Sequence, residues 1–278
     1  MPKSTKSARP TSEQAFQRIL DVTPIAIKDV NSLTIRVFQT RGGRIGSGLG
    51  GVIEALWGFY VNKHLLKSDL GAEMAWISGH EYNDFAVIIC DEDWDPQKGT
   101  SELFRVEVKS MVRSAKEPKA HFDRLRKEIK HTDTLAVFIW DWVPVSKGSK
   151  RCYPKILDGF VGRASAIATL RDELHVARGG TFVPKNKCPD GCRMPCCHID
   201  EPLNPNGVRE RKSGPVNSKK GKTTFQANFG GLKRMLGVRG VEAIKTLQKF
   251  AKRKNDAAQY VSFIQRNFKR APYPTEAP

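Results

Sequence analysis

The sequence predicts an α/β fold in which a central sheet is flanked by helices, followed by a Cys/His insertion and a basic, mostly helical C-terminal region. Short apolar segments with strand periodicity alternate with segments whose apolar residues recur at helical spacing. The charge is uneven: residues 1–142 hold 20 basic and 19 acidic residues, whereas residues 143–278 hold 27 and 10. A chain of 278 residues can bury a core together with a smaller region.

Two predicted strands organise the core, at Phe85–Cys90 and Leu103–Lys109, and Asp84 precedes the first. Side chains alternate along a strand, so Glu107 and Lys109 point to the same face of the second. If the strands are adjacent, two carboxylates and one ammonium group share a site. Hard carboxylate oxygens beside an ammonium group suit Mg²⁺ and a phosphate.

The neighbouring segments give a regular order of elements. The apolar residues of Gly51–Leu66 recur near helical period, and Met74–Ser78 is typical of a further strand. Lys116–His131 has apolar residues three and four apart, as in a helix, and Thr134–Val143 is apolar enough for a strand buried on both faces. The predicted order is therefore helix, three strands, helix, strand.

This core resembles a known family. Asp84, followed some two dozen residues later by Glu107-Val108-Lys109, resembles the D…ExK signature of PD-(D/E)XK nucleases, which include most type II restriction endonucleases. The position before the aspartate is Asn83 here, and that family varies at this position. The resemblance covers residues 45–143 and includes the order of elements. It implies a restriction-endonuclease-like core with a mixed sheet.

The resemblance also implies roles for these residues. Asp84 and Glu107 would hold Mg²⁺, with the Val108 carbonyl as a further ligand. Lys109 would position the attacking water and lower its pKa, or stabilise charge that builds on the phosphate. In this family the first helix commonly supplies another acid, and Glu54 is the candidate for an outer or second-metal ligand.

An acidic run between the two strands offers an alternative. Its members have the one, three, five, twelve spacing of a calcium loop: Asp91, Asp93, Asp95 and Glu102. Pro96 stands where such a loop needs glycine, so we expect a hairpin connection and no calcium site. Asp91 or Asp93 remains an alternative to Asp84 as the magnesium ligand.

A second candidate metal centre lies in the Cys/His segment. Its potential ligands outnumber the four that a tetrahedral zinc needs: Cys188, Cys192, Cys196, Cys197 and His198. Structural Zn²⁺ is the leading interpretation. The alternatives are an iron–sulfur cluster, for which Cys152 could be a distant ligand, and reduced thiols without a metal. Cys90 lies in an apolar strand, where a core thiol is expected.

The positive charge of the second half favours a nucleic-acid partner, because neutralised phosphates release counterions and supply most non-specific affinity. A membrane surface is a poorer partner, since no amphipathic helix with a strong apolar face accompanies the charge. The candidate DNA contacts lie in the Gly-rich segment before the first core helix and in the basic half: Arg41, Arg44, Lys185, Lys187, Arg211, Lys212, Lys219, Lys220, Lys222, Lys245 and Lys249.

Weaker signals predict elements outside the core. Thr11–Val22 predicts a short helix in which Thr11 and Gln14 form a capping box. Ser32–Thr40 alternates as in a strand or an extended arm, and a strand followed by a helix is expected within residues 155–178. The chain is expected to end in three helices, at Phe229–Leu236, residues 241–250 and residues 257–268, the last capped by Asn255 or Asp256.

Together these features predict a magnesium-dependent, sequence-specific endonuclease that cuts duplex DNA, of type II restriction type. Its predicted parts are an N-terminal arm and helix (1–44), a catalytic core (45–180), the Cys/His module (181–204) and a basic DNA-binding region (205–278). Because one active site makes one nick, we expect a homodimer at least on DNA.

Two other functions remain open. One is a repair, recombination or mobile-element nuclease on the same core, and the other is a non-catalytic zinc-containing nucleic-acid-binding protein. No segment approaches the ~20 apolar residues that cross a bilayer. No apolar signal segment follows the basic start, so we expect no membrane partner and a cytoplasmic protein.

Overall fold

The computed structural model describes residues 9–41, 48–78, 83–114, 120–185, 199–207, 215–217, 223–225, 229–237, 240–253 and 255–268. The chain forms two compact units. The first comprises residues 1–118 and 130–164, and the second comprises residues 119–129 and 165–278. The predicted division at residues 44, 180 and 204 rests on composition and stays a prediction.

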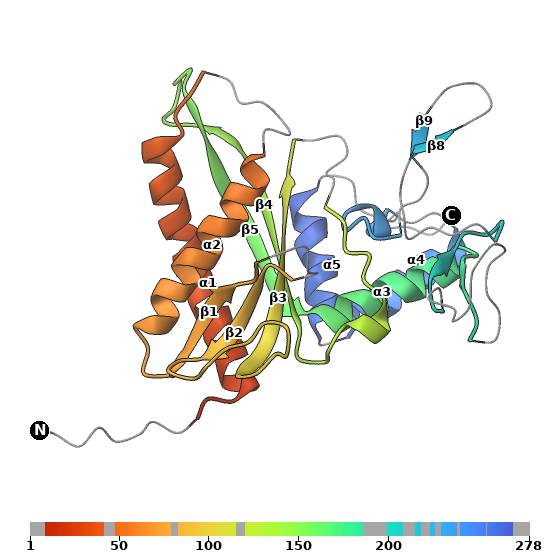
Figure 1. Ribbon diagram of the computed structural model, residues 1–278. Helices are drawn as coiled ribbons and strands as arrows, with labels where there is room; N and C mark the ends of the chain where they lie inside the picture. Colours follow the sequence, from red (N-terminus) through yellow and green to blue (C-terminus); the bar gives the residue numbers. More distant parts are fainter. Residues whose placement is uncertain are drawn as a thin grey trace, which may run out of the picture. The chain divides into compact units, whose positions relative to one another are not determined.

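The first unit is built on a five-stranded mixed sheet, which confirms the α/β class (Figure 1). Its strands are β1 (Ala72–Trp76), β2 (Phe85–Ile89), β3 (Glu102–Val112), β4 (Thr134–Pro144) and β5 (Cys152–Arg163), in the spatial order β1-β2-β3-β4-β5. Neighbouring strands are antiparallel except β3 and β4, which are parallel. All five strands were expected, although β1 begins two residues before the predicted segment at Met74.

Two long helices, α1 (Ser12–Val37) and α2 (Leu49–Leu66), lie along one face of this sheet (Figure 1). The indole of Trp57 on α2 is fully buried and packs against the rings of Phe85 on β2 and Phe138 on β4. The backbone approaches closely here, because a Cβ placed on Gly58 would lie 2.2 Å from Cζ of Phe85. Tight packing of α2 therefore fixes its position above β2.

Helix α1 corrects one prediction. The capping box of Thr11 and Gln14 is present, but the helix continues to Val37, so the predicted strand or arm at Ser32–Thr40 is wrong over most of its length. Val30 and Thr34 are buried, so the buried face of the helix continues beyond the predicted end. This burial outweighs the weak helix propensity of β-branched residues. Only Thr40 has strand pairing, as a bridge to Cys152.

The second unit is mostly helical. Its described elements are η1 (Arg126–Glu128), α3 (Ala164–Ala177), β6 (Thr181–Phe182), β7 (Pro202–Leu203), β8 (Pro215–Asn217), β9 (Thr223–Phe225), η2 (Arg234–Leu236), α4 (Val241–Ala251) and α5 (Asp256–Asn267). Helix α5 begins with a hydrogen bond from Ala258 N to Asn255 Oδ1, as predicted. The predicted helix at Phe229–Leu236 is reduced to the single turn η2.

The predicted helix at Lys116–His131 is wrong: within residues 120–131 only η1 is helical. The chain there is extended, because Phe122 N donates to the Gly230 carbonyl and Leu232 N donates to the Ala120 carbonyl. Phe122 and Leu125 are buried as the spacing indicated, but in an extended strand-like segment. Within the described ranges, no helix is long and apolar enough to cross a membrane.

Candidate active site

The candidate site lies where β2 begins, beside the part of β3 that β2 does not cover. The last paired residues of the two strands are Phe85 and Val106, so residues 107–112 of β3 extend beyond β2. On this free length Glu107 and Lys109 point to the same face, as predicted, and form an ion pair between Oε1 and Nζ. Glu107 is buried and Lys109 is partly buried.

Asp84 joins this pair through the backbone of β3. Its Oδ2 accepts a hydrogen bond of 2.8 Å from Val108 N, and its own N donates to the Val106 carbonyl at 3.1 Å. In a β-strand the N–H and C=O of one residue point to the same side. The Val108 carbonyl therefore points, like its N–H, to the edge of β3 where the pairing with β2 has stopped. Asp91 follows the opposite end of β2, which favours Asp84 over Asp91 as the partner of Glu107 and Lys109.

Glu54 approaches the same region from α2. Its carboxyl group is hydrogen-bonded to Ser110, next to Lys109 on β3. Burial raises the pKa of Glu54 above its ordinary value, and the negative charge of Asp84 adds to that effect. The Ser110 hydrogen bonds and the Lys109 ammonium act in the opposite direction.

The approach of α2 depends on glycine. A Cβ on Gly50 would lie 2.6 Å from the hydroxyl oxygen of Ser110, whereas a Cβ on Gly51 would meet nothing within 4 Å. Ser110 was not a predicted site residue. In the sequence, Ser110 is distinguished only by its position directly after the E-x-K tripeptide. That position does not indicate that a helix from another part of the chain contacts it.

Lys109 is held as an ammonium group. Burial alone would lower its pKa, but the carboxylates of Glu107, Asp84 and Glu54 outweigh burial and raise the pKa above its ordinary value. Lys109 therefore carries a proton at neutral pH and cannot act there as a general base. It can donate hydrogen bonds and stabilise negative charge.

The donor set fits a hard divalent cation in its chemistry. When all are ionised, three carboxylates surround one ammonium group and leave a net charge of −2. Among the described residues, however, no three His, Cys, Asp or Glu side chains already converge as a metal-binding group. Asp84, Glu107 and the Val108 carbonyl are the groups that would hold a magnesium ion.

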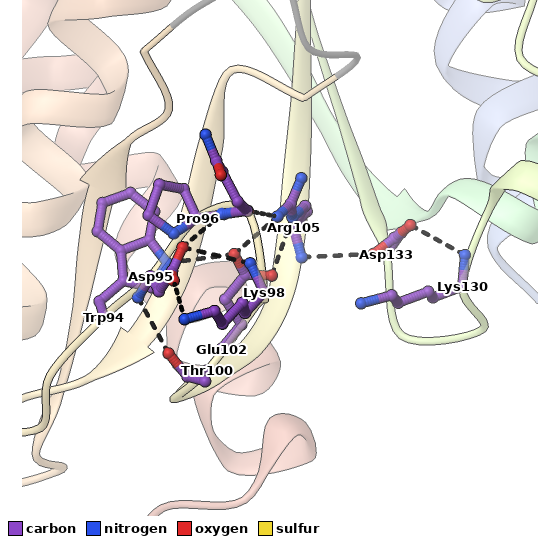
Figure 2. Close-up of polar contacts among 10 residues, drawn as sticks. Trp94, Asp95, Pro96, Lys98, Thr100, Glu102, Arg105, Lys130 and Asp133 are labelled. Carbon is purple, nitrogen blue, oxygen red and sulfur yellow. Dashed lines mark hydrogen bonds and ion pairs between the residues drawn. The ribbon is translucent and has the colours of Figure 1, made fainter.

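The connection between β2 and β3 is a hairpin closed by its own side chains, and its acids serve that closure (Figure 2). Glu102 accepts two hydrogen bonds of 2.9 Å from the Arg105 guanidinium and one of 3.1 Å from Trp94 Nε1. Asp95 Oδ1 accepts from the backbone amides of Gln97 and Lys98. The carboxylates of Glu102 and Asp95 therefore accept hydrogen bonds from groups of the protein, whereas in a calcium loop they would coordinate the ion.

The described residues include only part of the predicted DNA and zinc sites. Arg41 and Lys185 are exposed, as are Lys245 and Lys249 on α4, of which Lys245 pairs with Glu242 at 3.0 Å. The other predicted contacts and ligands lie outside the described residues: Arg44, Lys187, Arg211, Lys212, Lys219, Lys220, Lys222, Cys188, Cys192, Cys196, Cys197 and His198.

The two described cysteines are free thiols. Cys90 and Cys152 form no disulfide, and both are partly buried. Burial raises the pKa of the Cys90 thiol, and the negative charges of Glu73 and Asp91 add to the effect. Cys90 is therefore held in its neutral form, in keeping with a structural thiol.

No family model, curated protein or solved structure matches this chain.

Proposed function

We propose that this protein is a magnesium-dependent endodeoxyribonuclease with a PD-(D/E)XK-type core that cuts duplex DNA in the manner of type II restriction enzymes. The observation that carries the proposal is the hydrogen bond from Val108 N to Asp84 Oδ2, which sets the aspartate that precedes β2 against an E-x-K tripeptide on β3. The order of helix α2, three strands and the β4 strand supports the same core, although the described residues 120–131 before β4 hold only the single turn η1 in place of the expected helix.

Asp84 and Glu107 would hold the magnesium ion together with the Val108 carbonyl. The bound ion supplies positive charge for the scissile phosphate and lowers the pKa of a coordinated water. Lys109 remains protonated, so it orients the attacking water as a hydrogen-bond donor and stabilises charge on the phosphate. Glu54 is hydrogen-bonded to Ser110 and its negative charge acts on Lys109, which makes it a positioning residue in this scheme.

The basic half of the chain supplies phosphate contacts in this proposal. Arg41, Lys185 and the α4 lysines are exposed cations, and residues 205–278 hold 17 basic and 4 acidic residues. A homodimer on DNA would present two active sites to opposite strands. The Cys/His segment would bind a structural zinc ion.

A plasmid assay tests the proposal with a matched pair of variants. Purified protein is incubated with supercoiled DNA, with Mg²⁺ or with a chelator. We expect discrete fragments only with Mg²⁺, none from Asp84→Asn, and normal cutting by Asp91→Asn, since Asn tolerates the positive φ of 64° at that position.

The other outcomes point elsewhere. Smeared degradation products would favour a repair or processing nuclease on the same core. A gel shift without cleavage would favour a nucleic-acid-binding protein, and loss of cutting in Asp91→Asn with normal cutting in Asp84→Asn would overturn the site assignment.

A further inference from the structure

The side chain of Asn83, the residue directly before Asp84, is buried, and the nuclease mechanism does not use it. Its exposed fraction is 6%, and its amide nitrogen Nδ2 has no hydrogen-bond partner among the described residues. A buried donor that loses its water and gains no acceptor destabilises a fold. Such a group beside a candidate active site is therefore expected to serve a purpose other than stability.

The backbone of β2 fixes the face on which this side chain lies. Asp84 N donates to the Val106 carbonyl at 3.1 Å, and the Asp84 carbonyl accepts from Ile77 N at 3.0 Å, so the hydrogen-bond ladders on both sides of β2 include Asp84. Side chains alternate along a strand, which puts Asn83 on the same face as Phe85. Helix α2 covers this face, since its indole packs against the Phe85 ring.

Two contacts show that α2 and β2 run in the same direction. The helix meets β2 at Gly58, where an added Cβ would lie 2.2 Å from Cζ of Phe85. One turn later, Asn62 Oδ1 accepts a hydrogen bond of 2.8 Å from Met74 N. Met74 is the partner of Val87, which lies two residues after Phe85. One turn of α2 therefore advances about as far as two residues of β2.

The same step taken backwards brings Glu54 to Asn83. Glu54 lies one turn before Gly58, and Asn83 lies two residues before Phe85. A helical turn rises ~5.4 Å and two strand residues rise ~6.6 Å, so the two side chains stay level. The electrostatics agree, because the negative charge of Asp84 raises the pKa of Glu54 and thereby places its carboxyl group near the start of β2.

The Glu54 carboxyl group has room for a further donor. The hydroxyl and the backbone N–H of Ser110 donate to it, and an ionised carboxylate offers about four lone-pair sites. The amide nitrogen of Asn83 carries two N–H groups. A donor that no described residue accepts and an acceptor with remaining capacity therefore face each other where α2 meets β2.

We propose that Asn83 is a positioning residue of the nuclease site: its Nδ2 donates to the Glu54 carboxylate and, with Ser110, holds that carboxylate beside Lys109. The bond forms by rotation of the two side chains when the site binds its substrate. It is charge-assisted, hence short and directional, so it fixes the orientation of Glu54 between α2 and β2. The inference rests on the proposed function and deepens it, because it gives the residue before Asp84 a task.

A substitution that keeps the size of the side chain and removes its amide tests this role. Asn83→Leu removes a buried donor without an acceptor, so the urea midpoint of unfolding should stay unchanged or rise. The cleavage rate at saturating DNA should nevertheless fall about tenfold, with an unchanged KM for DNA. A merely structural asparagine would show the opposite pattern, a lower midpoint and a normal rate in the folded protein.

Asn62→Leu is the matched control. Asn62 lies two turns after Glu54 on the same helix, and its Oδ1 already accepts a hydrogen bond from Met74 N. This variant should lower the urea midpoint, because it leaves a backbone donor without its acceptor, and the folded protein should cut DNA at the normal rate.

A double variant shows whether Asn83 acts through Glu54. In a Glu54→Ala background, Asn83→Leu should lower the cleavage rate by less than about twofold, because the acceptor is already gone. Additive losses, a normal rate in Asn83→Leu alone, or a fall in its urea midpoint as large as that of Asn62→Leu would each overturn the proposal. Failure of the unchanged protein to cut DNA with Mg²⁺ would instead overturn the nuclease function, and this role with it.

Discussion

Strand β3 carries two acid–base pairs, one at its hairpin end and one on the part that extends beyond β2, and the two pairs are built differently. At the hairpin end, Glu102 and Arg105 are matched one to one, and Trp94 and the Pro96 carbonyl satisfy further donors and acceptors (Figure 2). At the other end, Glu107 and Lys109 are joined by two more carboxylates, those of Asp84 and Glu54. The first pair is balanced within the protein, whereas the second has an excess of negative charge.

The charge balance of each pair separates a structural ion pair from a candidate catalytic one on the same strand. A balanced, buried pair contributes little net stability but costs a great deal when one partner is removed. A cluster with surplus carboxylates has unfavourable repulsion that a cation from outside can relieve. Variants at the two ends should therefore change different properties.

The largest expected effect is the loss of DNA cleavage in variants of the Glu107–Lys109 pair. Glu107→Ala and Lys109→Ala should each reduce plasmid cleavage at least about a thousandfold, because they remove a metal ligand or the ammonium group of the cluster. DNA affinity, measured by gel shift, should stay within about tenfold, since it rests mainly on the basic half. Near-normal cutting by both variants would show that the excess negative charge of this cluster does not serve catalysis.

The second expected effect is on stability at the hairpin end. Arg105→Ala leaves the Glu102 carboxylate, 3% exposed in its side chain, without its guanidinium partner. We expect the free energy of unfolding to fall by about 3 kcal/mol, measured by urea denaturation. The folded fraction should still cut DNA at the normal rate; a cleavage defect as deep as that of Lys109→Ala would show that the two ends are not separable.

A smaller effect is expected from the helix that carries Glu54. Gly50→Ala would press on the Ser110 hydroxyl, while Gly51→Ala enters open space and should raise stability by up to about 1 kcal/mol. We expect Gly50→Ala to slow cleavage a few-fold by displacing Ser110 from Glu54. Equal rates for the two alanine variants would show that the position of α2 does not matter to the site.

The smallest effect is a pH dependence. Because burial raises the pKa of Glu54 in the folded state, its contribution to stability is full below the unfolded pKa and is lost as pH rises through the folded pKa. Glu54→Gln should therefore unfold at higher urea than the unchanged protein at pH 8 and at equal urea near pH 4. A stability difference that is the same at both pH values would contradict this.

Several features of the site were predictable from local rules. Alternation along β3 was enough to set Glu107 and Lys109 on one face. The choice between Asp84 and Asp91 was not, because both flank the same strand and only the pairing of Phe85 with Val106 shows which end meets the E-x-K tripeptide. The contact of Glu54 with Ser110 depends on tertiary packing that no spacing encodes.

The errors in the fold have the same origin. The apolar spacing of Phe122 and Leu125 fits a helix, but pairing with Gly230 and Leu232, more than one hundred residues later, draws the segment into an extended form. The length of α1 was missed because β-branched residues disfavour a helix locally, while burial against the sheet favours it. In both cases a distant partner decided between two conformations that the local sequence allows.

The passage of the chain from the first unit to the second and back has a consequence for its synthesis. Strand β4 returns to the sheet only after residues 119–129 have joined the second unit, and the partners of that segment, Gly230 and Leu232, are made about one hundred residues later. On a ribosome, the sheet can close once β5 has emerged, but Phe122 must wait about one hundred residues more for its partner. Neither unit can be isolated by cutting the chain once, and an early stop codon after β7 would release a sheet with an exposed, unpaired apolar segment that chaperones recognise.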